Sequence, residues 1–242
     1  MAGETQIFVL ETSEIHESSG PARQLFGSKL SQNERSTREK GPGMTKQIEF
    51  YFDFGSPYSY LAQSQLKKLA ADTQATVVYM PINVLDLMKA TGNTPTTMEC
   101  RAKRKYAKSD LQRWVKKYGV GWEPNQNFRH IDLNFLLRGA IAAIKLGVGP
   151  DFVSKVFTGL YAQVLDLGNV DILRDFLKKN ELPADRILEL MAQEETSEEL
   201  KARNKAAEEA GLFGTPTFRI GEELYFGNDR LPFVEAAAKA QA

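Results

Sequence analysis

The chain has 242 residues, of which 42% are hydrophobic, and its 31 Lys and Arg balance its 31 Asp and Glu. This length allows one domain with a large insertion or two small domains. The zero net charge gives no global field that would recruit nucleic acid or an anionic membrane, so we expect neither partner. The single cysteine, Cys100, excludes an internal disulfide and fits a reducing compartment, which we expect to be the cytoplasm.

Residues 1–43 differ in composition from the rest of the chain. They are rich in Glu, Ser, Arg and Gly, and they end in Gly41-Pro42-Gly43. This composition predicts a disordered extension ahead of a domain that begins near Met44. The extension lacks the basic start and the apolar core of a secretory signal.

The first predicted elements of the domain are a strand, a helix and a second strand. Residues 48–53 are rich in aromatic side chains and alternate imperfectly, as in a buried strand. Residues 57–71 have apolar side chains at helical spacing, with Ser56 as a natural N-cap and Pro57 as a natural first residue. Residues 76–80 predict a second strand, parallel to the first after a right-handed crossover.

A long helical block follows, and then strands return. Residues 84–195 are mainly helical in pattern, with Gly and Pro at the breaks. Residues 217–220 and 224–226 predict a hairpin, and residues 229–240 predict a closing helix.

The predicted fold class is therefore α/β, with elements in the order βαβ and then ββα. A sheet built from both ends of the chain is the simplest packing of these elements. We expect residues 44–83 and 196–242 to form this domain and residues 84–195 to form an inserted all-helical domain.

Ser56 is the most informative candidate residue. A strand that runs directly into Ser-Pro-x-Ser lies where a thioredoxin-type protein would carry Cys-x-x-Cys, and here both positions are serine, Ser56 and Ser59. An ordinary helix cap is the simpler interpretation. The functional interpretation is that the helix N-terminus and the Ser56 hydroxyl stabilise the thiolate of a bound thiol. We favour this role over nucleophilic attack by Ser56, because no base is recognisably paired with it.

Two loops near the C-terminus have both an ordinary and a functional interpretation. Thr215-Pro216 is a plain turn or, if Pro216 is cis, a backbone edge that faces the Ser56 helix end and pairs with an extended peptide. Asn228-Asp229 caps the last helix or holds the charged ends of a small ligand.

A basic stretch lies inside the helical block. Residues 101–117 contain eight Lys and Arg and one acid, Asp110. A solvated helix face explains this pattern, and an anionic small substrate is its better functional explanation. No set of His and Cys has the spacing of a zinc site, so we expect no metal.

Four motifs occur together and in order: Phe52-Asp53-Phe54-Gly55-Ser56-Pro57-Tyr58-Ser59-Tyr60-Leu61, Asp110-Leu111-Gln112-Arg113-Trp114, Gly214-Thr215-Pro216-Thr217 and Gly227-Asn228-Asp229-Arg230-Leu231. From about Met44 to the C-terminus, the chain resembles the 2-hydroxychromene-2-carboxylate isomerase family. That family is related to kappa-class glutathione transferases and to the DsbA thioredoxin-like group.

The resemblance implies a homodimer of thioredoxin-like subunits, each interrupted by a helical domain, with glutathione as cofactor. It implies that Ser56 touches the glutathione sulfur, that Thr215 binds the peptide backbone and that Asn228 and Asp229 hold the γ-glutamyl end. The remaining glutathione-binding positions that it implies are Pro57, Tyr58, Asn93 and Gly227. The substrate-binding positions that it implies are Lys89, Thr97, Met98, Phe128 and Phe226.

The activity that the resemblance implies is a glutathione-dependent isomerisation. The substrate would be 2-hydroxychromene-2-carboxylate, or a similar small anionic aromatic acid, and the product trans-o-hydroxybenzylidenepyruvate. Two alternatives stay open. A kappa-like transferase would consume glutathione, and a non-enzymatic thioredoxin-like binding module would show no affinity for it.

Overall fold

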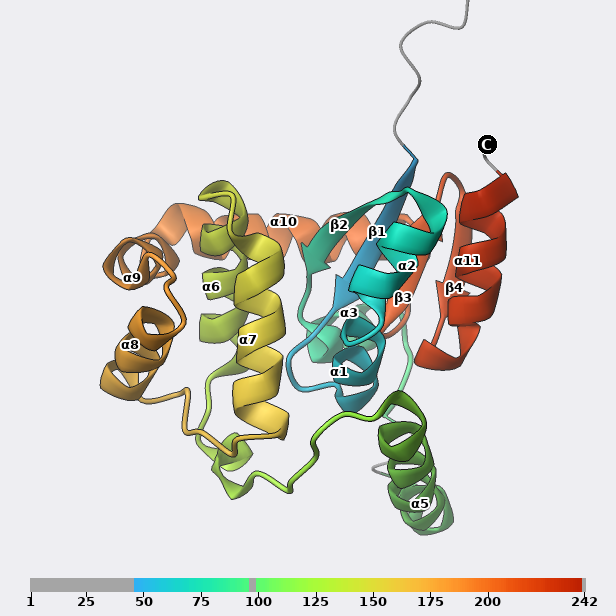
Figure 1. Ribbon diagram of the computed structural model, residues 1–242, viewed down its shortest axis with the longest axis horizontal. Coiled ribbons are helices and arrows are strands. Elements are labelled where there is room, and N and C mark those ends of the chain that lie inside the picture. Colours follow the sequence, from blue (N-terminus) through green and yellow to red (C-terminus); the bar gives the residue numbers. More distant parts are fainter. Residues whose placement is uncertain (1–45, 96–98, 241–242) are drawn as a thin grey trace, which may run out of the picture. The chain divides into compact units, whose positions relative to one another are not determined.

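The computed structural model describes residues 46–95 and 99–240 (Figure 1). Its elements, in chain order, are β1 (Gln47–Phe52), α1 (Pro57–Gln63), α2 (Leu66–Thr73), β2 (Thr76–Pro81), α3 (Val84–Ala90), α5 (Arg101–Tyr118), η1 (Gln126–Arg129), α6 (Leu133–Lys145), α7 (Gly149–Tyr161), α8 (Val170–Lys179), α9 (Ala184–Met191), α10 (Glu194–Glu209), β3 (Thr217–Ile220), β4 (Glu223–Phe226), η2 (Asn228–Arg230) and α11 (Leu231–Ala240).

The strands of the described part form one mixed sheet in the order β2-β1-β3-β4. β1 pairs with β2 in parallel and with β3 antiparallel, and β3 and β4 form the hairpin. Phe50 in the centre lies opposite Tyr79 on one side and Phe218 on the other. The α/β prediction, with a βαβ unit first and a ββα unit last, is confirmed.

One face of the sheet continues into the main hydrophobic core. Ile48, Phe50 and Phe52 alternate along β1, are fully buried and share this core with side chains from α2, α11, α6 and α7. The Phe52 ring lies 5.8 Å from that of Phe157 on α7. Figure 1 shows α2 and α11 side by side in front of the strands. Because the alternation of β1 has period two, the same residues that form the strand also fix which face is buried.

The opposite face of the sheet packs on α3 and α10. Tyr51, which points away from its β1 neighbours, belongs to a smaller cluster with Ile82, Leu87, Ala207 and Leu212. α3 therefore packs behind the sheet, and its first residue follows β2 closely.

The helices between β2 and β3 differ in how many of their side chains are buried. α6, α7, α8 and α9 contribute wholly buried side chains to the main core. α5 buries only Leu111 and projects away from the sheet in Figure 1. Among the helices it packs mainly on α1, and its last residue, Tyr118, also hydrogen-bonds to Asn228.

The helix predicted over residues 57–71 is interrupted. It is divided into α1 and α2 by Ser64 and Gln65, where the Ser64 hydroxyl donates to the Leu61 carbonyl at 2.6 Å. A serine side chain that bonds the backbone in this way competes with the regular helical ladder. Within the described residues, no helix combines the length and the apolar character needed to cross a membrane.

Candidate active site

Ser56 lies between β1 and α1 and caps the helix. Its side-chain oxygen accepts a hydrogen bond from the Ser59 N–H at 3.2 Å, and its carbonyl accepts from the N–H groups of Ser59 and Tyr60. Pro57, which has no N–H to satisfy, occupies the first turn. The local sequence therefore accounts for the backbone at Ser56, as in an ordinary cap.

A second contact of Ser56 is not local. Its hydroxyl donates to the Thr215 carbonyl at 3.3 Å, although the two residues are 159 positions apart. The peptide bond between Thr215 and Pro216 is cis, and the Pro216 carbonyl accepts a hydrogen bond from the Gly227 N–H at 2.9 Å. Three segments that the sequence singled out thus meet at one place.

Ser56 opens onto a cavity of about 670 Å³. We call this space the Ser56 cavity. α3 supplies one apolar wall, which includes Leu85 and Met88, and the rings of Phe213 and Phe226, 4.8 Å apart, supply another. The volume lies in the range of small-molecule sites, and the apolar walls suit a ligand with an apolar body.

Tyr58 also lines the Ser56 cavity. Burial and the nearby Asp110 raise the pKa of Tyr58 to about 12. The phenol therefore stays protonated at neutral pH and is a hydrogen-bond donor. Phe226 and Tyr58 are the two predicted site aromatics that the structure brings to Ser56.

Asp53 lies behind the cavity and was not among the predicted site residues. It is 3% exposed; one carboxylate oxygen accepts from the Gly55 N–H at 2.6 Å and the other from the Val84 N–H at 2.8 Å. Burial raises its pKa to about 6, although these two hydrogen bonds oppose the rise. Gly55 and Val84 both line the Ser56 cavity, so one buried carboxylate holds two of its walls. A charged residue between Phe52 and Phe54 was the sequence signal.

Asn93 lines the Ser56 cavity too, and its amide donates to the Phe213 carbonyl at 2.8 Å. Lys89 is exposed and does not line the cavity, whereas Lys108 of α5 does. Nothing in the local sequence distinguishes these two lysines. Thr97 and Met98 lie outside the described residues.

Phe128 faces a different hollow. That hollow, of about 270 Å³, shares Gly55 and Pro57 with the Ser56 cavity, and the Phe128 ring lies 5.1 Å from that of Tyr161 inside the fold. The structure therefore places Phe128 on the far side of the Ser56 loop from Phe226.

Asn228 and Asp229 also lie beside the Ser56 cavity rather than in its wall. Asn228 is 3% exposed, and its carbonyl accepts from the Tyr118 hydroxyl at 3.2 Å. Asp229 lines a third hollow, of about 240 Å³, together with Trp114. Within the described part of the chain, three buried atoms of this region have no hydrogen-bond partner: Ser59 Oγ, Thr215 Oγ1 and Asn228 Nδ2. Buried polar atoms of this kind normally have a hydrogen-bond partner.

The four-stranded sheet, with a capping serine at the start of the helix after its first strand, defines a thioredoxin-like protein. Residues 47–239 match the DSBA-like thioredoxin domain family. A Pseudomonas putida protein named 2-hydroxychromene-2-carboxylate isomerase is 34% identical over 197 residues, which cover 78% of this chain and 93% of that protein. The chain belongs to the DSBA-like thioredoxin family and, within it, to the 2-hydroxychromene-2-carboxylate isomerase family.

A solved structure agrees with this assignment. The structure of a 2-hydroxychromene-2-carboxylate isomerase has a TM-score of 0.71 and 29% identity, and the match covers 79% of this chain and 93% of that one. Glutathione S-transferase kappa 1 of Caenorhabditis elegans is 24% identical over 203 residues, 77% of this chain and 88% of that protein. The chain is thus related to enzymes, to isomerases first and to kappa transferases at lower identity.

Proposed function

We propose that this protein is a glutathione-dependent isomerase. It converts 2-hydroxychromene-2-carboxylate, or a similar acid from aromatic degradation, to trans-o-hydroxybenzylidenepyruvate. One observation carries the proposal: Ser56 caps α1 at the edge of an apolar cavity, against the Thr215 carbonyl, in a chain 34% identical to a protein named for this reaction.

The residues around Ser56 fit glutathione. Thr215 Oγ1 and Asn228 Nδ2 are buried without partners in the described residues, and glutathione carries amide and carboxylate groups that would satisfy them. The Thr215 backbone would pair with the peptide, and Asn228 and Asp229 would hold the γ-glutamyl end. Pro57, Tyr58, Asn93 and Gly227 would complete the site.

When bound, glutathione supplies a thiolate that adds reversibly to a conjugated carbon of the substrate, permits ring opening and bond rotation, and leaves again unchanged. The Ser56 hydroxyl would turn from the Thr215 carbonyl, a contact of 3.3 Å at the long end for hydrogen bonds, and donate to the sulfur. The positive end of the α1 dipole adds to this stabilisation of negative charge. Much of the cavity wall is apolar, and electrostatic interactions beside an apolar wall are stronger than in bulk water.

Phe226 is the substrate-binding residue that the geometry supports best, since its ring lies in the cavity wall. Phe128 would contact the substrate only across the Ser56 loop, and Lys89 only from outside the cavity. Thr97 and Met98 follow Pro95, which lines the cavity, and stay part of the proposal through the family resemblance.

Glutathione-dependent turnover of 2-hydroxychromene-2-carboxylate by the purified protein tests the function. We expect turnover with glutathione and none without it. An equal rate with and without glutathione would overturn the proposal. Ser56→Ala should lower the rate by about 10- to 100-fold, the effect of one hydrogen bond to a charged group. Ser109→Ala, an exposed serine on α5, is the matched control and should leave the rate unchanged.

A kappa-like transferase is the second candidate, because a kappa-class relative matches over 77% of the chain. Product analysis separates the two functions. Glutathione recovered in full after turnover supports the isomerase, and glutathione consumed in step with the electrophile supports the transferase.

We also infer a homodimer in the cytoplasm. The family resemblance supports the dimer, and a single cysteine, Cys100, supports a reducing compartment. Light scattering on the purified protein measures the mass directly, and a value near 27.1 kDa would contradict the dimer.

A further inference from the structure

The charge of the Ser56 cavity comes from one side chain. Its walls are built from neutral residues of the Ser56 loop, α3 and the segment around Thr215. Of the described residues that line it, Lys108 alone is charged. A cationic group in an otherwise neutral and largely apolar space is the arrangement that would select a ligand with an apolar body and one anionic group.

The position of Lys108 on α5 explains why it differs from the other basic residues there. α5 carries eight Lys and Arg, but Ala107, Lys108 and Leu111 are the α5 residues that line the cavity. Residue 111 shares a face with residues 107 and 108 because it follows them by four and three positions. Lys117 instead lies 4.6 Å above the Trp114 ring, beside the third hollow.

Lys108 has no ion-pair partner among residues 46–95 and 99–240. Asp110, the acid on the same helix, lies near Arg113 at 3.7 Å and accepts from the Tyr106 hydroxyl at 3.4 Å. Both oxygens of Asp53 are occupied by the N–H groups behind the cavity wall. The Lys108 charge is therefore available to a ligand.

We propose that Lys108 binds the carboxylate of the substrate and thereby restricts the Ser56 cavity to aromatic acids. The inference rests on the proposed function and identifies Lys108 as the residue that recognises the acidic group of the substrate. The aromatic body lies against Leu85, Met88 and the Phe226 ring, and the carboxylate reaches the Lys108 ammonium. This pairing separates acids from neutral electrophiles of the same shape.

Equilibrium binding tests the proposal without turnover. The probes are 2-naphthoate, an aromatic acid, and 2-naphthamide, its neutral analogue, titrated calorimetrically into the whole protein. Lys108→Met keeps the length and the helix propensity of the side chain but removes its charge. We expect Lys108→Met to raise the Kd for 2-naphthoate by about 10- to 100-fold, as for a lost hydrogen bond to a charged group. The Kd for 2-naphthamide should change by less than about two-fold.

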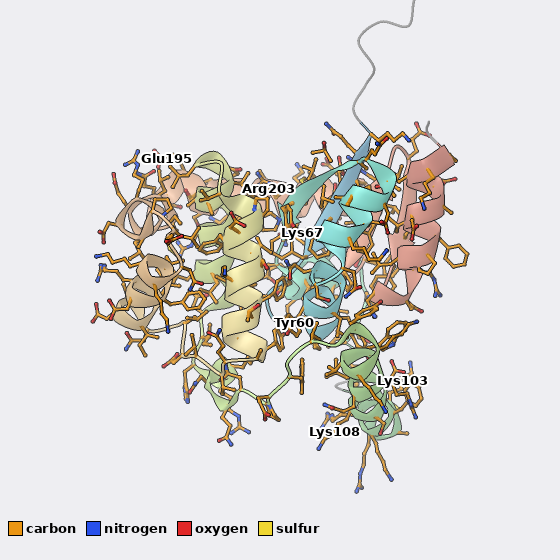
Figure 2. The ribbon with its side chains drawn as sticks, in the orientation of Figure 1. Tyr60, Lys67, Lys103, Lys108, Glu195 and Arg203 are labelled. Carbon is orange, nitrogen blue, oxygen red and sulfur yellow. The ribbon has the colours of Figure 1, made fainter. Side chains whose placement is uncertain are left out.

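Two further variants sharpen the comparison. Lys103 lies on the same helix as Lys108 (Figure 2), and a separation of five residues turns it about 140° away. Lys103→Met removes the same charge from α5 and should change neither Kd. Lys108→Arg keeps a cation and should retain most of the affinity for 2-naphthoate.

Three results would overturn the proposal. These are no binding of 2-naphthoate to the wild type, equal loss in the Lys103 and Lys108 variants, and a loss of glutathione affinity in Lys108→Met while 2-naphthoate binding is kept. The last would assign Lys108 to the glutathione site. A wild type that binds 2-naphthoate through Lys108 but shows no turnover would refute the proposed function and leave this inference standing. With turnover, Lys108→Met should raise KM for the acid far more than it lowers kcat.

Discussion

Asp53→Asn tests the role of the buried carboxylate behind the cavity. The pKa of Asp53 is about 6 in the folded chain against the ordinary 3.8, because burial disfavours its charged form. The folded protein therefore binds this proton more tightly than the unfolded chain does. The stability that results is fully present below about pH 4 and is lost as the pH rises through about 6.

The size of the effect follows from these two values. By linkage, the full loss is about 3 kcal/mol, of which about 2 kcal/mol develops between about pH 4.5 and about pH 7.5. Asp53→Asn has no proton to release. The variant should therefore gain about 2 kcal/mol of unfolding free energy relative to the wild type over that range.

Urea denaturation at several pH values measures this difference. Subtracting the wild-type curve from the variant curve cancels the groups that titrate alike in both proteins. The absolute offset is a separate quantity, because an amide has one acceptor oxygen for the Gly55 and Val84 N–H groups and leaves one unsatisfied. Asp175→Asn, on the exposed side of α8, controls for the loss of one carboxylate. Parallel curves for wild type and Asp53→Asn would refute the reasoning.

Two substitutions probe the supports of the site. Tyr161→Phe removes a hydroxyl that donates to the buried Phe54 carbonyl at 2.9 Å, and should cost about 1–3 kcal/mol by urea denaturation. Tyr106→Phe, an exposed tyrosine, should cost less than about 0.5 kcal/mol, and equal costs would contradict the role of Tyr161. Gly214→Ala places a Cβ 2.9 Å from the Phe226 ring, so the ring must move and calorimetry should show weaker binding of 2-naphthamide. Unchanged affinity would mean that the Phe226 ring position does not matter.

The fold was predictable because its strands and helices carry period-two and helical patterns that the structure obeys. Ile48, Phe50 and Phe52 alternate into the core, and the hairpin turn lies where the sequence predicts it. The break at Ser64 was not predictable from periodicity, because apolar side chains continue in phase on both sides of it. Only the local bond from the Ser64 hydroxyl to the Leu61 carbonyl distinguishes that position.

Some residues of the candidate site were predictable from the sequence and others were not. Ser56 was predictable because a Ser-Pro pair after a strand is a local signal with a local cause. Lys108 was not, since eight basic residues on one helix look alike until the orientation of that helix is known. Asp53 has a signal in the sequence, a charged residue within an aromatic run. Its consequence, hydrogen bonds to Gly55 and Val84, depends on how α3 returns to the sheet.

The α3 wall of the Ser56 cavity is held at both of its ends by the segments next to β1 and β3. At its start, the Val84 N–H donates to Asp53, and just after its end, the Asn93 amide donates to the Phe213 carbonyl. Asn93 therefore has a structural task besides the glutathione contact that the family resemblance implies. If an Asn93 variant binds glutathione more weakly but binds 2-naphthoate as the wild type does, Asn93 contacts glutathione directly. If the variant binds both ligands more weakly, the substitution has displaced the α3 wall, because the binding of both ligands depends on the position of α3.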